Sequence, residues 1–113
     1  MKLIEAIIRP FKLDDVREAL SEVGVRGFTI TEVEGYGRQK GQASLYNGVK
    51  HAFDFIPKVK VEVALEDDVV DKALACIEKS AKTGKVGDGK IYVTDVIDVV
   101  RIRTGERGAE AIK

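Results

Sequence analysis

A glycine-rich segment, residues 84–90, contains residue types that can bind phosphate. Its glycines would let main-chain N–H groups approach phosphate oxygens, and Lys85 and Lys90 supply positive charge. The spacing of Gly84, Gly89 and Lys90 approaches that of a P-loop, but Ile91 stands where a P-loop has a hydroxyl for Mg²⁺. The expected order of elements is also reversed, with a helix before the segment and a strand after it. We therefore exclude a P-loop NTPase, and an ordinary turn remains the alternative to a phosphate site.

Basic residues recur in pairs elsewhere in the chain. Arg101 and Arg103 are two positions apart in a β-rich segment, so both side chains are expected on one face. Arg38 and Lys40 have the same spacing, and Lys58 opens a strand pattern. Arginine suits bidentate recognition of phosphate. Because 19 Lys and Arg balance 19 Asp and Glu, a triphosphate is a better match than a polynucleotide. The alternative is ordinary solvated charge, in a chain that is 34% charged.

The remaining composition disfavours several classes of function. Zero net charge and the absence of Trp argue against nucleic-acid binding. His51 is the only histidine and Cys76 the only cysteine, so we expect no nucleophile–histidine pair, zinc cluster or internal disulfide. The lone cysteine, the lack of a signal sequence and the lack of a membrane-spanning apolar run predict a cytoplasmic protein without membrane insertion.

Residues 35–58 lack both the strand period and the helix period of apolar side chains. The segment is rich in glycine and opens with a cluster of glycine and basic residues. A structureless connection of about 20 residues is uncommon in a compact domain and is usually functional or disordered. We expect a loop that becomes ordered when a ligand or partner binds. A hairpin within the segment is the alternative.

The elements that must position these groups follow from apolar periodicity. Alternation predicts strands, and apolar spacings of three and four predict helices. The first predicted elements are, in chain order, strand 2–8, helix 13–23, strand 28–36, strand 58–65 and helix 68–82. After this second helix come the glycine-rich segment, a strand from Ile91, a β-rich piece at 96–103 and a charged tail from Thr104.

An internal repeat indicates the fold. The helix residues 14–20 resemble residues 67–74, and each set follows an apolar strand. Two such halves predict a ferredoxin-like βαββαβ sandwich of the α+β class, with one four-stranded antiparallel sheet and both helices on one face. Apolar residues on both faces of strand 2–8 and of piece 96–100 indicate that other subunits cover the second face. A monomer with a half-exposed sheet is the alternative.

Several separated motifs resemble the PII signal-transduction proteins, over nearly all of residues 1–107. The resemblance implies a single domain over 1–113, a homotrimer with ATP or ADP in the clefts between subunits, and a loop at 37–55 that docks onto target proteins. The motifs are Arg9-Pro-Phe-Lys-Leu-Asp-Asp-Val-Arg-Glu-Ala-Leu20, Gly35-Tyr-Gly-Arg-Gln-Lys-Gly41, Thr83-Gly-Lys-Val-Gly-Asp-Gly-Lys-Ile-Tyr-Val93 and Arg101-Ile-Arg-Thr-Gly105.

The resemblance also implies site residues. Ala64 falls where the family often has valine, and Arg101 and Arg103 would come from the neighbouring subunit. The implied 2-oxoglutarate site comprises Gln39, Lys40, Gly41 and Lys58, with Gln39 also helping to hold Mg²⁺ beside ATP. The implied nucleotide site comprises Thr29, Gly35, Gly37, Arg38, Gln39, Glu62, Ala64, Gly87, Asp88, Gly89, Lys90, Arg101 and Arg103.

The chain departs from the family pattern at the tip of the loop. His51 falls where many bacterial members carry a uridylylated tyrosine, and Val49 falls where cyanobacterial members carry a phosphorylated serine. No modification is therefore expected at His51. The resemblance implies a non-enzymatic regulator of nitrogen metabolism, whose target is an ammonium transporter, a signalling kinase or a biosynthetic enzyme. Alternatives are an adenine-nucleotide sensor of carbon or energy status without covalent control, a nucleotide-hydrolysing enzyme and an RNA-binding module.

Overall fold

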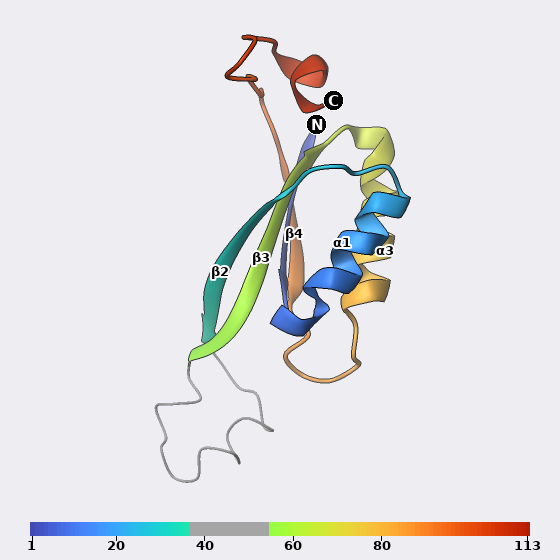
Figure 1. Cartoon of the computed structure of the whole chain (residues 1–113), viewed down its shortest axis with the longest axis vertical. Coiled ribbons are helices and arrows are strands. Elements are labelled where there is room, and N and C mark those ends of the chain that lie inside the picture. The colour runs from blue at the N-terminus through green and yellow to red at the C-terminus, as the bar shows by residue number, and fades with distance from the viewer. Residues whose placement is uncertain (37–54) are drawn as a thin grey trace.

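The computed structural model describes residues 1–36 and 55–113 (Figure 1). Two of the helical elements, η1 and η3, are short 3₁₀ helices. The predicted strands and helices are confirmed to within one or two residues at most of their ends. In chain order the elements are β1 (Lys2–Ile8), η1 (Pro10–Lys12), α1 (Leu13–Glu22), β2 (Thr29–Tyr36), β3 (Phe55–Leu65), α3 (Asp67–Ala81), β4 (Lys90–Asp95) and η3 (Gly108–Ile112).

The four strands form one antiparallel sheet in the order β2-β3-β1-β4. Helices α1 and α3 lie side by side on one face of this sheet (Figure 1). The predicted ferredoxin-like α+β fold is therefore confirmed. Among the described residues, no helix is both long enough and apolar enough to cross a membrane.

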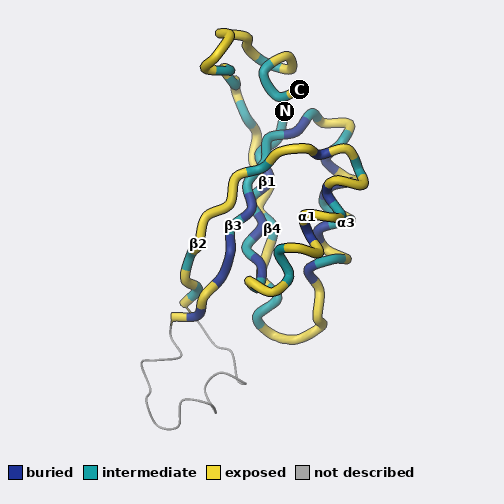
Figure 2. Tube along the Cα trace, viewed as in Figure 1, coloured by how far each residue is buried: buried dark blue, intermediate teal, exposed yellow. Residues whose placement is uncertain are grey.

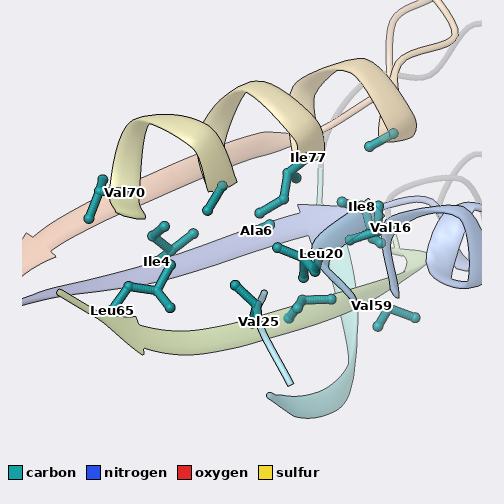
Figure 3. Packing of buried hydrophobic residues seen from close by; sticks show 13 residues of the cluster. Ile4, Ala6, Ile8, Val16, Leu20, Val25, Val59, Leu65, Val70 and Ile77 are labelled. Atoms are coloured by element: carbon teal, nitrogen blue, oxygen red, sulfur yellow. The ribbon is translucent and has the colours of Figure 1, made fainter. Parts of the chain in front are cut away.

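The core lies between the sheet and the two helices (Figure 3). Alternate residues of β1 point into it: Ile4 and Ala6 are fully buried and Ile8 is nearly so. Val16 and Leu20 of α1 meet them, as the predicted helical stripe requires. Burying each such aliphatic side chain contributes about 1.5–3 kcal/mol. The intervening residues of β1 and β3 consequently lie on the helix-free face, where the candidate site begins. Strand β2, at the edge of the sheet, is exposed over most of its length (Figure 2).

Strand β3 begins earlier than the apolar pattern predicts. The ladder between β2 and β3 extends to the pair Tyr36 and Phe55, whose rings meet edge-on with centroids 5.5 Å apart. The predicted end of the second strand at Tyr36 is therefore confirmed, whereas the strand predicted from Lys58 begins three residues earlier; residues 37–54 lie outside the described residues. The sequence did not predict residues 55–57 as part of the strand, because Pro57 is among them and proline is disfavoured within sheets. It is tolerated here because β1 pairs with β3 only from Val59 onward, so β3 has no neighbour on that side at Pro57.

The segment after β4 is not the β-rich piece that was predicted at 96–103. It forms a single bridge, between Val100 and Arg107, and then turns. The N–H of Gly105 donates to the Arg101 carbonyl at 2.7 Å, and the φ of +74° at Gly105 suits this turn. The prediction that Arg101 and Arg103 share a strand face is therefore wrong. The predicted tail is also folded, because η3 occupies part of it.

Candidate functional site

The connection between α3 and β4 is organised by the carboxylate of Asp88. It accepts hydrogen bonds from the N–H groups of Thr83 at 2.9 Å and Gly84 at 2.8 Å, and from the Thr83 hydroxyl. These hydrogen bonds, led by that of the Thr83 hydroxyl, hold the pKa of Asp88 well below its usual range. Gly84, Gly87 and Gly89 have positive φ angles, which explains the density of glycine in this segment. The result is a closed turn with its shape set by one carboxylate.

Gly89 brings this turn against β1. A Cβ atom at Gly89 would lie 1.7 Å from the carbonyl oxygen of Ile7, far closer than any real contact. The two main chains therefore meet at a distance that only glycine permits. This close approach places the turn at the carboxyl end of β1, where Arg9 follows.

Arg9 ties the turn to the end of β1. Its Nε donates to Asp88 Oδ1 at 3.0 Å, and its Nη2 donates to the carbonyl of Val86 at 2.9 Å. The side chain is largely buried, with 13% exposed. Arg9 was not predicted as a site residue. The signal available in the sequence was its position directly after a predicted strand and before Pro10, which places Arg9 at the end of that strand.

Lys58 meets the same turn from β3. Its side chain is buried, and its ammonium donates to the carbonyl of Gly87. Burial first, and then the positive charge of Arg9, lower the pKa of Lys58, while the Asp88 carboxylate opposes them. A Cβ atom at Gly35 would lie 3.5 Å from Lys58 Cγ. The fold therefore brings together the predicted residues Gly35, Lys58, Gly87 and Asp88.

The residues predicted to line the adenine side lie at the other end of the same sheet. Thr29 pairs directly with Glu62 across β2 and β3, and Ala64 is two residues further along β3. All three line a cavity of about 820 Å³. The Lys60 ammonium lies 3.5 Å from Glu62 and 3.7 Å from Glu5, so it partly neutralises two carboxylates that are paired across the strands. Lys90 opens β4 opposite Ile7 on this helix-free face.

Two further predicted residues, Arg101 and Arg103, are not brought to this cluster. Arg101 and Arg103 belong to the segment after β4, at the end of the molecule opposite the α3–β4 turn (Figure 1). Arg101 pairs with Glu106 at 2.8 Å within its own chain, and Arg103 is exposed. The predicted residues Gly37, Arg38, Gln39, Lys40, Gly41 and His51 lie outside the described residues.

The described residues contain no group of three or more His, Cys, Asp or Glu side chains that could hold a metal ion. The expected Mg²⁺ contact, Gln39, is not among them. Cys76 donates to the carbonyl of Ala73 at 3.3 Å, and burial raises the pKa of its thiol. A raised pKa disfavours the reactive thiolate, so Cys76 is a packing residue of α3.

The fold and the cluster define a ferredoxin-like α+β subunit in which a glycine turn, an arginine and a buried lysine meet near the end of the β2–β3 ladder. The family model described as "Nitrogen regulatory protein P-II" matches residues 1–106. The protein of that name from Azospirillum brasilense is 60% identical over 112 residues, covering 99% of this chain and 100% of the relative. "Nitrogen regulatory protein P-II 1" of Escherichia coli strain K12 is also 60% identical, and the Bradyrhizobium diazoefficiens protein is 56% identical, with the same coverage.

The chain therefore belongs to the P-II family of nitrogen regulatory proteins. Its role is nitrogen-regulatory signal transduction. Members of this family are known as non-enzymatic regulators that bind nucleotides and act through target proteins.

Asp88→Asn is expected to destabilise the protein at neutral pH. An amide cannot accept all the hydrogen bonds of the carboxylate, and a hydrogen bond to a charged group contributes about 1.5–3 kcal/mol. Because the folded state lowers the pKa of Asp88, this stabilisation is complete above the unfolded pKa and is lost as the pH falls below about 4. Urea unfolding at equal protomer concentration should show the wild-type advantage narrowing between pH 5 and pH 2.

Asp14→Asn is the matched control, because its side chain is 89% exposed. It should change the free energy of unfolding by less than about 0.5 kcal/mol at neutral pH. An Asp88→Asn variant as stable as this control would show that the hydrogen bonds to Asp88 do not hold the turn.

Proposed function

We propose that this protein is a trimeric cytoplasmic sensor in which ATP and ADP compete for one site and 2-oxoglutarate binds beside Mg-ATP. Ligand binding changes the loop at 37–55 and thereby the affinity for target proteins, with a coupling of about 1–3 kcal/mol. The observation that carries the proposal is the meeting of Lys58, Arg9 and the Gly87–Asp88 turn at the end of the β2–β3 ladder, from which the loop departs.

The glycine turn supplies the phosphate contacts in this proposal. Main-chain N–H groups of Gly87 and Gly89 donate to phosphate oxygens, and the Lys90 ammonium adds charge. The close approach of Gly89 to Ile7 supports this role, because it holds the main chain of the turn in one place. Thr29, Glu62 and Ala64 line the adenine side, and the guanidinium groups of Arg101 and Arg103 reach the phosphates from a neighbouring subunit.

Lys58 supplies the contact to 2-oxoglutarate. A buried ammonium with a lowered pKa gains more from a carboxylate than from the neutral carbonyl of Gly87 that it now contacts. Gln39 offers an amide oxygen, a ligand type that suits Mg²⁺, and Lys40 and Gly41 offer main-chain N–H groups. Bound Mg²⁺ would supply positive charge between the phosphates and the keto acid.

The homotrimer is supported by apolar side chains that this single subunit leaves in water. Ile97 is 100% exposed and Ile102 is 99% exposed. Ile102 lies between the two arginines that the site needs from a second copy, and Ile97 lies four residues before Arg101. Burial of such side chains between subunits is favourable. Light scattering at micromolar concentration should give a mass of about three times 12.4 kDa. A monomer would remove the site between subunits.

Calorimetry on one preparation tests the sensing function. ATP and ADP should each bind and displace one another, and 2-oxoglutarate should release heat only when ATP and Mg²⁺ are present. Binding of single-stranded RNA without binding of nucleotide would overturn the proposal in favour of an RNA-binding module. ATP hydrolysis at many turnovers per minute would overturn the non-enzymatic assignment.

The proposed targets are an ammonium transporter, a signalling kinase or a biosynthetic enzyme. Capture of partners from native lysate, with and without 2-oxoglutarate, should give two different sets of bound proteins. A sensor of carbon or energy status without covalent control is the second candidate, favoured by His51 at the modification position. It would respond to the ATP to ADP ratio and show no dependence on 2-oxoglutarate.

Uridylylation is not expected, because His51 offers an imidazole nitrogen where the modifying enzyme needs a phenolic oxygen. The wild-type mass should stay unchanged after incubation with a uridylyltransferase and UTP, whereas His51→Tyr should gain one uridylyl group per chain. A stable adduct on the wild-type chain, at His51 or at Tyr46, would contradict this expectation.

A further inference from the structure

The guanidinium of Arg101 is already engaged by the chain that carries it. Its Nη1 donates to Glu106 Oε1 at 2.8 Å. Its Nη2 donates to the main-chain oxygen of Lys113 at 2.9 Å and lies 3.4 Å from that of Ala111. Residues 104–113, which we call the C-terminal strap, therefore hold both terminal nitrogens of this arginine.

Glu106 is held in place for this contact. The hydroxyl of Thr104 donates to the same oxygen, Glu106 Oε1, at 2.7 Å, and the N–H of Arg101 donates to the Glu106 carbonyl at 2.8 Å. The Thr104 hydroxyl, and then the charge of Arg101, lower the pKa of Glu106. Glu106 is consequently a fixed, negatively charged acceptor at neutral pH.

The C-terminal strap also reaches the cavity in the sheet. Ile112 and Lys113 line the cavity of about 820 Å³ together with Thr29, Glu62 and Ala64. A second charged hydrogen bond, in which Arg107 Nε donates to Asp98 Oδ2 at 2.9 Å, holds the strap to the segment before it. One segment therefore binds a proposed phosphate-binding arginine and lines the same cavity as the proposed adenine-side residues.

We propose that the C-terminal strap is an internal competitor for nucleotide, with Glu106 occupying Arg101 until a phosphate group displaces it. This inference rests on the proposed function, because it requires Arg101 to bind nucleotide phosphate. Guanidinium binds carboxylate and phosphate through the same N–H groups. Glu106 occupies Nη1 and the main-chain oxygen of Lys113 occupies Nη2, so a phosphate that takes both nitrogens displaces both acceptors of the strap. The pair is partly exposed to water, and such a pair is weak enough for a phosphate to replace it.

The test compares ATP affinities of full-length variants by calorimetry. Glu106→Gln keeps the size of the side chain and an acceptor for Thr104 but removes the charge, and it should tighten ATP binding three- to tenfold. Glu110→Gln is the matched control: it removes the same charge from the same strap, and Glu110 pairs with Lys113 rather than with Arg101. Its ATP affinity should stay within twofold of the wild type.

A double-mutant cycle with Arg101→Ala isolates the contact. In the Arg101→Ala background, Glu106→Gln should no longer tighten ATP binding. An unchanged or weaker ATP affinity of Glu106→Gln alone would overturn the proposal and make Glu106 a positioning residue for Arg101. Equal tightening in both backgrounds would also overturn it, because the effect would then be general electrostatics.

Hydrogen exchange supplies a readout without nucleotide. Glu106→Gln should raise the exchange rate of the N–H groups of Arg101, Gly105 and Gly108, which are hydrogen-bonded in the closed strap. In the wild type, saturating ATP should raise the same rates. Faster exchange in the variant, with no ATP binding by any protein, would show that the strap closes as described but that both the nucleotide site and the competition are wrong.

Discussion

Lys58→Met is expected to abolish binding of 2-oxoglutarate and to leave ADP binding within tenfold of the wild type. Methionine keeps the apolar stem of this buried side chain, so the packing between β2 and β3 is retained. The variant removes the ammonium that a carboxylate would contact. The nucleotide contacts in our proposal rest on the glycine turn and on Arg101 and Arg103, which are unchanged. Calorimetry with ADP alone, and with 2-oxoglutarate in the presence of Mg-ATP, measures both affinities.

Lys60→Met is the control for charge on the same face of the same strand. Lys60 contacts Glu5 and Glu62 rather than the glycine turn, and it lies outside the proposed 2-oxoglutarate site. Its affinity for 2-oxoglutarate should fall less than tenfold, or about 1.4 kcal/mol. If Lys58→Met weakened ADP binding by more than tenfold, Lys58 would belong to the nucleotide site and the two sites would be wrongly divided.

Gly89→Ala is expected to give the largest loss of stability of any variant considered. The added Cβ would lie 1.7 Å from the Ile7 oxygen and 2.9 Å from the Ile7 carbonyl carbon, and both are main-chain atoms of a central strand. Strain at positive φ adds roughly 1–2 kcal/mol to the cost of the clash. We expect the free energy of unfolding to fall by more than about 3 kcal/mol, measured in urea at fixed protomer concentration.

Gly84→Ala separates the clash from the backbone strain. Gly84 lies in the same turn with a φ of +85°, close to the +93° of Gly89, but a Cβ atom there would meet nothing within 4 Å. Its expected cost is the strain alone, roughly 1–2 kcal/mol. If the two alanine variants lost equal stability, the turn would be able to move away from β1, and the close approach would not hold the main chain of the turn in place.

The sequence by itself determined most of the secondary structure and the fold class. Alternation in residues 59–65 and the helical spacing of Val16 and Leu20 are local patterns. The structure buries Val16, Leu20 and the alternating residues of 59–65, with Val63 only partly buried. The repeat of residues 14–20 at 67–74 was enough to predict two halves and hence the antiparallel sheet. The same local rules failed at Phe55–Pro57 and at 96–103, where pairing with another segment, or its absence, decides the conformation.

Only the tertiary structure decided which candidate residues meet. Arg9 reaches Asp88 across 79 positions and Lys58 reaches Gly87 across 29, because β1 and β3 are neighbours whose ends converge on one turn. The sequence had paired Arg101 with Arg103, whereas the folded chain pairs it with Glu106 and the C-terminal strap. Such contacts depend on how packed elements orient their ends and side chains, and periodicity within a single element carries no information about that orientation.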